Sequence, residues 1–251
     1  MMISRLDSVV VGVDNLADAT ADYALMFGAE GVAANVDGRS AHRFGTSNTD
    51  LCLVEKQGDR AGMESLVFAV PDIAGALRRL DKVGIDVDSD KNGLIALKRE
   101  HARNLQFIFC DDVSHSKEVI ESPSGDGLTG LDHAVIASGD GDYTASLLSA
   151  RLQLDMRLDL TNPDWDARLM FFRCGDLIVE VYQPLSKPLA PERDRFFGLS
   201  WRADNIDRAH ATFTEHGFDI SEVRTGRRPG SRVFTVRDRT HGVPTLVLGV
   251  D

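Results

Sequence analysis

Apolar residues along the chain fall into short segments of two kinds, which differ in the spacing of the apolar positions. Short runs rich in Val, Ile, Leu and Phe predict strands, and longer segments with apolar residues three and four positions apart predict helices. The order strand, helix and further strands occurs four times, and weaker strand signals follow Gly31. The predicted strands cover residues 7–13, 42–44, 50–54, 65–70, 94–98, 105–109, 131–136, 168–173, 177–182, 198–201, 232–236 and 245–248.

Capping residues mark the helices between these strands. Asn15 can cap the first helix, and Gly28 follows its last apolar residue. Pro71 stands at the entry of the second helix, where its fixed backbone is tolerated. The four predicted helices run from 15 to about 27, from 71–73 to just before 84, near 143–152, and over 206–216.

Pairs of repeats are similar in sequence as well as in order. Residues 6–11 (LDSVVV) match residues 131–136 (LDHAVI), which ties the first repeat to the third. Residues 70–73 (VPDI) match residues 203–206 (ADNI), which ties the second repeat to the fourth. Self-similarity at a regular period is the signature of tandem supersecondary units. The sequence therefore predicts an α+β fold of four βαβββ modules.

A polar segment divides the four modules into two halves. Residues 111–129 are rich in Ser, Asp, Gly and Lys and contain only scattered apolar residues, as expected of a linker. We predict an N-terminal domain of modules 1 and 2 over residues 1–112 and a linker over 113–129. A C-terminal domain of modules 3 and 4 follows over residues 130–251.

The balance of charge narrows the class of ligand. The chain has 39 Asp and Glu against 28 Lys and Arg, a formal net charge of −11. Nucleic acids and anionic membrane surfaces attract basic faces, so we expect neither as the main partner. The expected partner is a small-molecule substrate, and a homodimer is an open alternative to a monomer.

No apolar run approaches the roughly 20 residues of a membrane-spanning helix. The first five residues lead into a strand without the apolar core of a secretion signal. Cys52, Cys110 and Cys174 are an odd number of widely spaced cysteines, which favours reduced thiols. These observations predict a cytoplasmic location.

Two polar residues interrupt the apolar strands of the third module. His133 lies two positions from Val135 and therefore shares its strand face, and Glu180 shares a face with Ile178 and Tyr182 in the same way. Both polar side chains are therefore expected to point to one side of a sheet. A carboxylate turned inward needs a partner, a proton or a metal. The alternative is a hydrogen-bonded core histidine and an edge-strand glutamate on the solvent side.

The Leu-Asp-His opening at 131–133 and the Val-Glu-Val close at 179–181 resemble the vicinal oxygen chelate superfamily. That superfamily includes glyoxalase I, bleomycin resistance proteins and extradiol dioxygenases. The resemblance implies that modules pair into two glyoxalase-like cupped sheets. It also implies that metal ligands come from the first and last strands of the modules.

The resemblance implies an incomplete ligand set. The positions implied by the first strands hold Ser8, Ser65, His133 and Gly198, and those of the last strands hold Cys52, Gln106, Glu180 and Leu246. If modules 3 and 4 form one cup, only His133 and Glu180 remain as ligands; pairing modules 2 and 3 would add Gln106. We therefore expect one divalent metal (Zn, Ni, Mn or Fe), weakly bound or absent. Modules 1 and 2 are expected to be mainly structural.

Two arginines bracket the strand that follows Trp165. Arg168 and Arg173 lie on opposite faces of a regular strand, so at most one of them enters the cup. Beside Trp165, Arg168 is the favoured fork for a substrate carboxylate. An ion pair between Arg168 and an acidic side chain is an equal alternative.

Module 4 carries a local excess of arginine in an acidic chain. Arg228 lies in a predicted loop at the rim, and Arg232 is predicted to face an anionic ligand. Ser200 and Arg202 share the strand face of Gly198 and are predicted to line the same cavity. The competing interpretation is a solvated charged surface. His101 and His241 are weaker candidates for metal ligands than His133 and Glu180.

Three functions follow from these residues. The first is a lyase or isomerase, in which Glu180 is a metal ligand or a general base next to a carbonyl and His133 is a ligand or an electrophile. The second is a non-catalytic small-molecule binding or resistance protein. The third is an extradiol dioxygenase. That function needs two further metal ligands, and the positions implied for them hold Gly198 and Leu246.

Overall fold

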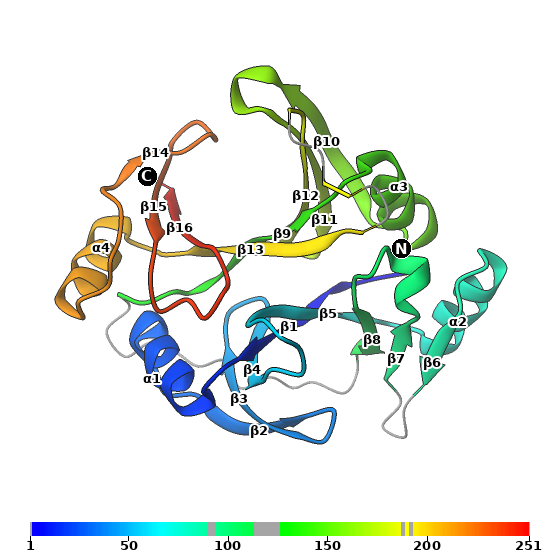
Figure 1. The fold of residues 1–251 in the computed structure, drawn as a ribbon, viewed down its shortest axis with the longest axis horizontal. Coiled ribbons are helices and arrows are strands. Elements are labelled where there is room, and N and C mark those ends of the chain that lie inside the picture. Colours follow the sequence, from blue (N-terminus) through cyan, green and yellow to red (C-terminus); the bar gives the residue numbers. More distant parts are fainter. Residues whose placement is uncertain (1, 90–93, 113–125, 187–188, 191–192, 251) are drawn as a thin grey trace. The chain divides into compact units, whose positions relative to one another are not determined.

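A computed structural model describes residues 2–89, 94–112, 126–186, 189–190 and 193–250 (Figure 1). Its elements repeat the order strand, helix and three strands four times, which confirms the predicted α+β class and the tandem modules. Module 1 contains β1 (Arg5–Val13), α1 (Leu16–Phe27), β2 (Val32–Val36), β3 (Arg39–Gly45) and β4 (Asp50–Glu55). Module 2 contains β5 (Gly62–Val70), α2 (Ile73–Lys82), β6 (Val87–Ser89), β7 (Ile95–Leu97), the 3-10 turn η1 (Arg99–Ala102) and β8 (Phe107–Asp111).

The C-terminal modules follow the same order. Module 3 contains β9 (Gly130–Ala137), α3 (Gly141–Ser146), the π turn η3 (Leu147–Arg151), β10 (Asp155–Asn162), the 3-10 turn η4 (Pro163–Trp165), β11 (Ala167–Cys174) and β12 (Leu177–Pro184). Module 4 contains β13 (Arg195–Arg202), α4 (Ile206–Glu215), β14 (Arg224–Thr225), β15 (Ser231–Val236) and β16 (Thr245–Val250).

The predicted helix signals act as expected. The side chain of Asn15 accepts hydrogen bonds from the backbone N–H groups of Ala17 and Asp18 at the start of α1. Gly28 ends that helix in the left-handed conformation, with φ of 64°. Asn205 caps α4 in the same way as Asn15, by accepting from the backbone N–H of Arg208.

Strand β10 is an element that the periodicity did not predict. It occupies the edge of its sheet, and all its residues but the last are exposed. Its pairing with β11 shifts register between Met156 and Leu158. An edge strand tolerates charged side chains, and a bulge interrupts the alternation of faces, so the segment lacks a clear period of two.

The strands form two eight-stranded sheets, in the orders β2-β3-β4-β1-β5-β8-β7-β6 and β10-β11-β12-β9-β13-β16-β15-β14. In modules 2, 3 and 4 the first strand pairs in parallel with the last. The preceding strand adds on in antiparallel pairing, as β11 does to β12. First and last strands are therefore neighbours within each of these modules, although about 45 residues separate them along the chain in module 3.

Packing divides the chain into two compact units. One unit takes the described residues of 1–8, 64–116 and 133–197, and the other takes those of 9–63, 117–132 and 198–251. The first therefore contains most of modules 2 and 3, and the second most of modules 1 and 4. The domain boundaries expected from the sequence stay a prediction, and residues 113–125 of the expected linker lie outside the described residues.

Aromatic side chains fill the core of each unit. In the first unit the ring of Phe107 lies 5.7 Å from that of Phe68 and 6.0 Å from that of Phe196. In the second unit the ring of Phe27 lies 5.3 Å from that of Phe44 and meets Trp201 edge-on at 5.1 Å. Cys52, Cys110 and Cys174 are all buried. Over the described ranges, no helix is long and apolar enough to cross a membrane.

Candidate functional site

The structure brings His133 and Glu180 into contact in the first compact unit. Strand β12 pairs in parallel with β9, so that Ile178 lies beside His133 and Glu180 beside Val135. The Nε2 atom of His133 lies 3.3 Å from Oε2 of Glu180. The imidazole is 18% exposed and the carboxylate side chain 10%, so the pair is largely withdrawn from water but still reachable. Adjacent strands thus supply both side chains on rigid backbone.

Helix α3 defines which side of the sheet carries this pair. A Cβ atom on Gly141 of α3 would meet the side chains of Gln183 and Met170, so these two residues face the helix. Alternate residues of β11 and β12 face the other way. We call this other side the His133 face. Its members, from the strand register, include His133, Val135, Ala137, Asp155, Leu158, Leu160, Leu169, Phe171, Arg173, Ile178, Glu180 and Tyr182.

The His133 face is mostly apolar around the polar pair. Leu158 is 49% exposed and Leu160 is 37% exposed, although both are large aliphatic side chains. The ring of Tyr182 lies 6.1 Å from that of Phe197, which is itself 40% exposed. Exposed apolar side chains that gather beside convergent polar groups are a common feature of ligand sites. The arrangement can hold a small molecule with an apolar portion next to His133 and Glu180.

Arg168 lies on the α3 side of β11, in the ion pair that the sequence left as an equal alternative. Its guanidinium donates from Nε and Nη2 to both carboxylate oxygens of Asp159, at 2.9 and 2.8 Å. It also donates to Asp142 at 2.7 Å. The hydrogen bonds from Arg168 hold the pKa of Asp159 below its ordinary value. The predicted role of Arg168 as a carboxylate fork would require these contacts to open, and its neighbour Trp165 lies half exposed in η4.

The predicted ligand-binding residues of module 4 lie in the second compact unit. The guanidinium of Arg232 forks onto Asp207 of α4 at 2.7 and 2.8 Å and holds the pKa of that carboxyl below its ordinary value. Arg232 pairs with Gly249, whose Cβ position would touch Ile206, so Arg232 faces the helix. Arg232 therefore lies on the α4 side of β15, and its predicted role in facing an anionic ligand stays a prediction. Helix α4 lies beside β15 and β16 (Figure 1).

The other three residues of this group have different surroundings. Ser200 is buried and pairs with Leu246 across β13 and β16. The Nε atom of Arg202 lies 3.3 Å from Oδ1 of Asp132. Arg228 is exposed in the turn before β15, where its carbonyl accepts hydrogen bonds from Ser231. Their predicted roles in ligand binding stay predictions.

The donor atoms at His133 and Glu180 can be compared with what a metal needs. Two ligand atoms 3.3 Å apart have the spacing of neighbouring ligands on one ion with bonds of about 2.1 Å. A catalytic zinc site holds its ion with about three protein ligands. The side-chain amide of Gln106 donates to the carbonyl of Leu97 at 3.3 Å, just before β8. Over the described residues, the pair is not part of any group of three close His, Cys, Asp or Glu ligands, and two such ligands alone do not fit a tightly held ion.

A second group of potential ligands lies elsewhere in the first unit. Single donor atoms of Asp86, Glu100 and His101 lie within 4.8 Å of one another. The Nε2 atom of His101 is 3.3 Å from Oδ2 of Asp86. The two carboxylates are exposed at 67% and 73%, whereas the imidazole is 26% exposed. From the sequence only His101 of these three was considered as a ligand, because Asp86 comes close to Glu100 and His101 only through the antiparallel pairing of β6 with β7.

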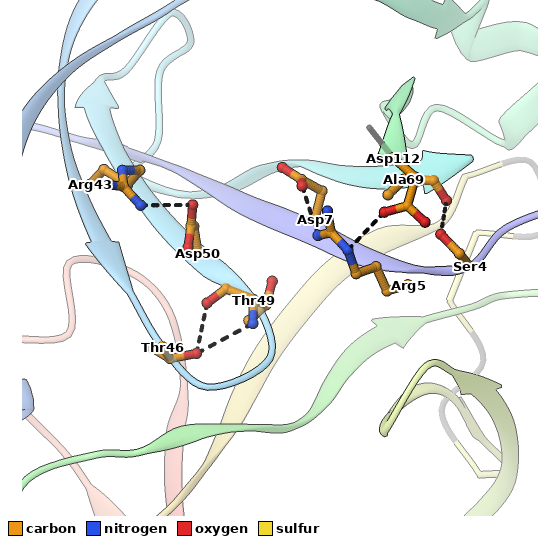
Figure 2. Close-up of polar contacts among 9 residues, drawn as sticks. All are labelled: Ser4, Arg5, Asp7, Arg43, Thr46, Thr49, Asp50, Ala69 and Asp112. Carbon is orange, nitrogen blue, oxygen red and sulfur yellow. Dashed lines mark hydrogen bonds and ion pairs between the residues drawn. The ribbon is translucent and has the colours of Figure 1, made fainter. Parts of the chain in front are cut away.

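Polar contacts in the N-terminal modules hold strands in place (Figure 2). In the first unit, Arg5 bridges Asp7 and Asp112 at 2.8 and 3.1 Å. In the second unit, Arg43 contacts Asp50 at 3.2 Å beside a turn closed by the hydroxyl of Thr46. Ser8, Cys52 and Ser65, at the positions implied for ligands, are all buried. The mainly structural role expected of modules 1 and 2 stays a prediction.

Two residues that were not expected from the sequence lie on or beside the His133 face, namely Arg173 and Phe197. Arg173 is on the His133 face, and it was set aside because only one of two alternating arginines could face inward. Arg173 shares a face with Phe171, and Phe171 pairs with Glu180 across the strands; this register places Arg173 on the face of Glu180 and is not visible in the sequence. Nothing in the sequence around Phe197 indicated its contact with Tyr182.

Comparisons with known proteins identify the fold. No family model and no curated protein sequence matches the chain. The structure is similar to the Mn(II)-bound glyoxalase from Novosphingobium aromaticivorans, with a TM-score of 0.74 and 15% identity over 99% of this chain and 82% of that one. It is similar to the 2,3-dioxygenase LapB from Pseudomonas sp. KL28, with a TM-score of 0.76 and 13% identity over 99% and 93% of the two chains.

A third similar structure is 2,2',3-trihydroxybiphenyl 1,2-dioxygenase from Sphingomonas wittichii. Its TM-score is 0.74 at 16% identity, over 98% of this chain and 90% of that one. Glyoxalase and extradiol dioxygenase structures share the vicinal oxygen chelate fold, and this chain has that fold over nearly its whole length. At these identities the likeness concerns the fold, and the reaction must be argued from the side chains.

Proposed function

We propose that the chain is an enzyme of the lyase or isomerase type that removes a proton next to a carbonyl of a small anionic substrate. The observation that carries this proposal is the contact between His133 and Glu180 on an apolar face. A largely buried carboxylate that contacts an imidazole and is held on a rigid strand is a suitable general base. The remaining apolar side chains would exclude water from the reacting carbon.

Each of the two side chains has a distinct part in this proposal. Glu180 takes the proton from the carbon next to the carbonyl. His133, at 3.3 Å, orients the carboxylate or donates a hydrogen bond to the oxygen on which negative charge develops. Because the donor set is incomplete, the proton transfer is assigned to the protein's own side chains. We expect any divalent ion at His133 and Glu180, with Gln106 as a further candidate ligand, to bind weakly.

Exchange of the proton next to a carbonyl tests this function directly. The wild-type protein is incubated in D2O with small 2-oxo acids, and loss of the C–H signal is followed by proton NMR. Glu180→Gln should reduce the rate by about 100-fold or more, and His133→Ala by a smaller factor. Glu215→Gln, on the exposed end of α4, is the matched control and should leave the rate unchanged. Equal rates in wild type and Glu180→Gln would exclude Glu180 as the base.

The second candidate is a non-catalytic binding or resistance protein. The incomplete ligand set favours it, because the apolar His133 face can hold a ligand without any chemistry. Calorimetric binding of a ligand that stays unchanged after prolonged incubation, and that is insensitive to Glu180→Gln, would favour this function.

The third candidate, an extradiol dioxygenase, is favoured by the fold of its structural relatives alone. Gly198 and Leu246 offer no side-chain ligand at the positions where that chemistry would need them. Consumption of oxygen with catechols by the iron-loaded protein would support it over the proposed lyase or isomerase.

A further inference from the structure

Arg173 lies in the same row of side chains as the histidine of the proposed site. It pairs with Ile178 across β11 and β12, and Ile178 pairs with His133 across β12 and β9. Paired residues of neighbouring strands point to the same face of a sheet. Strands are about 4.8 Å apart, so the Cα atoms of Arg173 and His133 are separated by about 10 Å.

The guanidinium of Arg173 is available to a ligand. Arg173 is exposed, and among the described residues no carboxylate lies within ion-pair distance of it. Asp155 is its cross-strand neighbour on β10, but the carboxylate of Asp155 contacts Arg157 at 2.9 Å instead. Arg168 on the same strand differs from Arg173, because its guanidinium forms ion pairs with both Asp159 and Asp142.

The surface between Arg173 and Glu180 is apolar. Phe171 is the next residue of β11 on the same face as Arg173, two positions earlier in the chain, and it pairs with Glu180. Leu158 of the exposed edge strand β10 pairs with Phe171 from the other side. A guanidinium that projects from such a surface can form two parallel hydrogen bonds to a carboxylate. The apolar side chains would then contact the body of the same molecule.

We propose that Arg173 anchors the carboxylate of the substrate, and that the substrate is a small carboxylic acid with an apolar group that packs on Leu158 and Phe171. This inference rests on the proposed function, because it takes the proton abstracted by Glu180 to belong to the same molecule. With its carboxylate on Arg173, such an acid lies across the strands with its carbonyl-bearing portion toward His133 and Glu180. Arg173 is thus a substrate-binding residue that sets specificity for acids over neutral analogues.

Binding measurements with a defined acid and its neutral analogue test the anchor. The probes are 4-phenyl-2-oxobutanoate and its methyl ester, titrated by calorimetry into the full chain at low salt. The acid should bind the wild-type protein at least about tenfold more tightly than the ester, as expected for a charge-assisted pair. Arg173→Ala should remove this preference, and Arg173→Lys should retain only part of it, since lysine keeps the charge but lacks the fork.

A matched control separates a specific contact from the general field of the protein. Arg78→Ala removes an exposed arginine from α2 in the same compact unit and should leave the acid preference intact. Circular dichroism of each variant verifies that the fold is retained. Equal loss in Arg78→Ala and Arg173→Ala, or no preference for the acid in the wild-type protein, would overturn the anchor.

The same probe distinguishes failure of the anchor from failure of the proposed function. If the acid exchanges its proton in a manner that depends on Glu180, Arg173→Ala should raise KM about tenfold and leave kcat nearly unchanged. Exchange with unchanged KM in Arg173→Ala would refute the anchor and retain the function. Binding that depends on Arg173 without any exchange would retain the anchor and refute the function.

Discussion

Arg103 and Asp194 form a buried ion pair in the first compact unit, with Nε of the arginine 3.0 Å from Oδ1 of the aspartate. The carboxylate is fully buried, and it also accepts hydrogen bonds from the hydroxyl of Thr144 and the backbone N–H of Gly139. The Asp194 backbone N–H donates to the Arg103 carbonyl. This network joins the end of η1 in module 2 to the start of α3 in module 3 and to the segment before β13.

Removal of one partner from this pair should strongly destabilise the fold. Arg103→Ala leaves the Asp194 carboxylate buried without its cation, so we expect a loss of about 3–5 kcal/mol in the free energy of unfolding. Urea unfolding measures this loss. Asp219→Asn, which breaks an exposed pair with Arg237, is the control and should cost less than about 1 kcal/mol. Similar small losses in both variants would show that water reaches the Asp194 carboxylate.

Metal content should reflect the incomplete ligand set at the candidate site. We expect substoichiometric divalent metal in protein purified without chelator or affinity-tag nickel. His133→Ala and Glu180→Gln should reduce it further with little effect on folding. Elemental analysis measures the metal, and thermal unfolding checks the fold. Stoichiometric iron that survives dialysis against a chelator would mean that a further ligand completes the site.

His101→Ala is the complementary variant for the metal measurement. The exposed group of Asp86, Glu100 and His101 offers three donors, so it could account for bound metal by itself. If metal is lost in His101→Ala and retained in both His133→Ala and Glu180→Gln, the ion belongs to the exposed group and not to the candidate site.

The ion pair between Arg168 and Asp159 should add stability only above acidic pH. The hydrogen bonds from Arg168 lower the pKa of Asp159 in the folded state. A lowered folded pKa stabilises the protein above the unfolded value of about 3.9, and this stability is lost as pH falls through the folded pKa. Because both partners are partly exposed, we expect at most about 1 kcal/mol.

Asp159→Asn should therefore lower Tm at neutral pH, and the Tm curves of wild type and variant should converge as pH falls through the lowered folded pKa of Asp159. Thermal unfolding over a pH series measures the two curves. Asp164→Asn, in the neighbouring turn η4, is the control and should give a smaller difference. A gap between wild type and Asp159→Asn that persists at the lowest pH would contradict an electrostatic origin.

Small dicarboxylates and 2-oxo acids should raise Tm in a salt-sensitive way, since screening weakens exposed charge pairs. The sequence alone predicts that Arg232→Ala abolishes this shift. The fork of Arg232 onto Asp207 on the α4 side leads us to expect instead that the shift persists in Arg232→Ala and disappears in Arg173→Ala. Loss of the shift in Arg232→Ala alone would restore the first interpretation and place the anion in module 4.

Local sequence determined the modules and the two polar residues of the candidate site. Caps such as Asn15 and Gly28 act through their immediate neighbours, so their effect can be read from adjacent residues. The common face of Glu180 and Tyr182 follows from the period of two in a regular strand. The shared side of His133 and Glu180 followed from the same alternation together with the repeat of the modules.

Tertiary structure decided which charged side chains share the site. Arg168 and Arg173 are equivalent in the pattern of their strand, and only the position of α3 shows that Arg168 is on the helix side. The partners that engage Arg168 and Arg232 lie 9 and 25 residues away in sequence, at Asp159 and Asp207. The sequence determined which residues of one strand share a face, because that depends on the strand alone. Which of the two faces lies toward the helix depends on helix packing and on cross-strand register. These are contacts between segments whose spacing along the chain carries no signal of their spatial proximity.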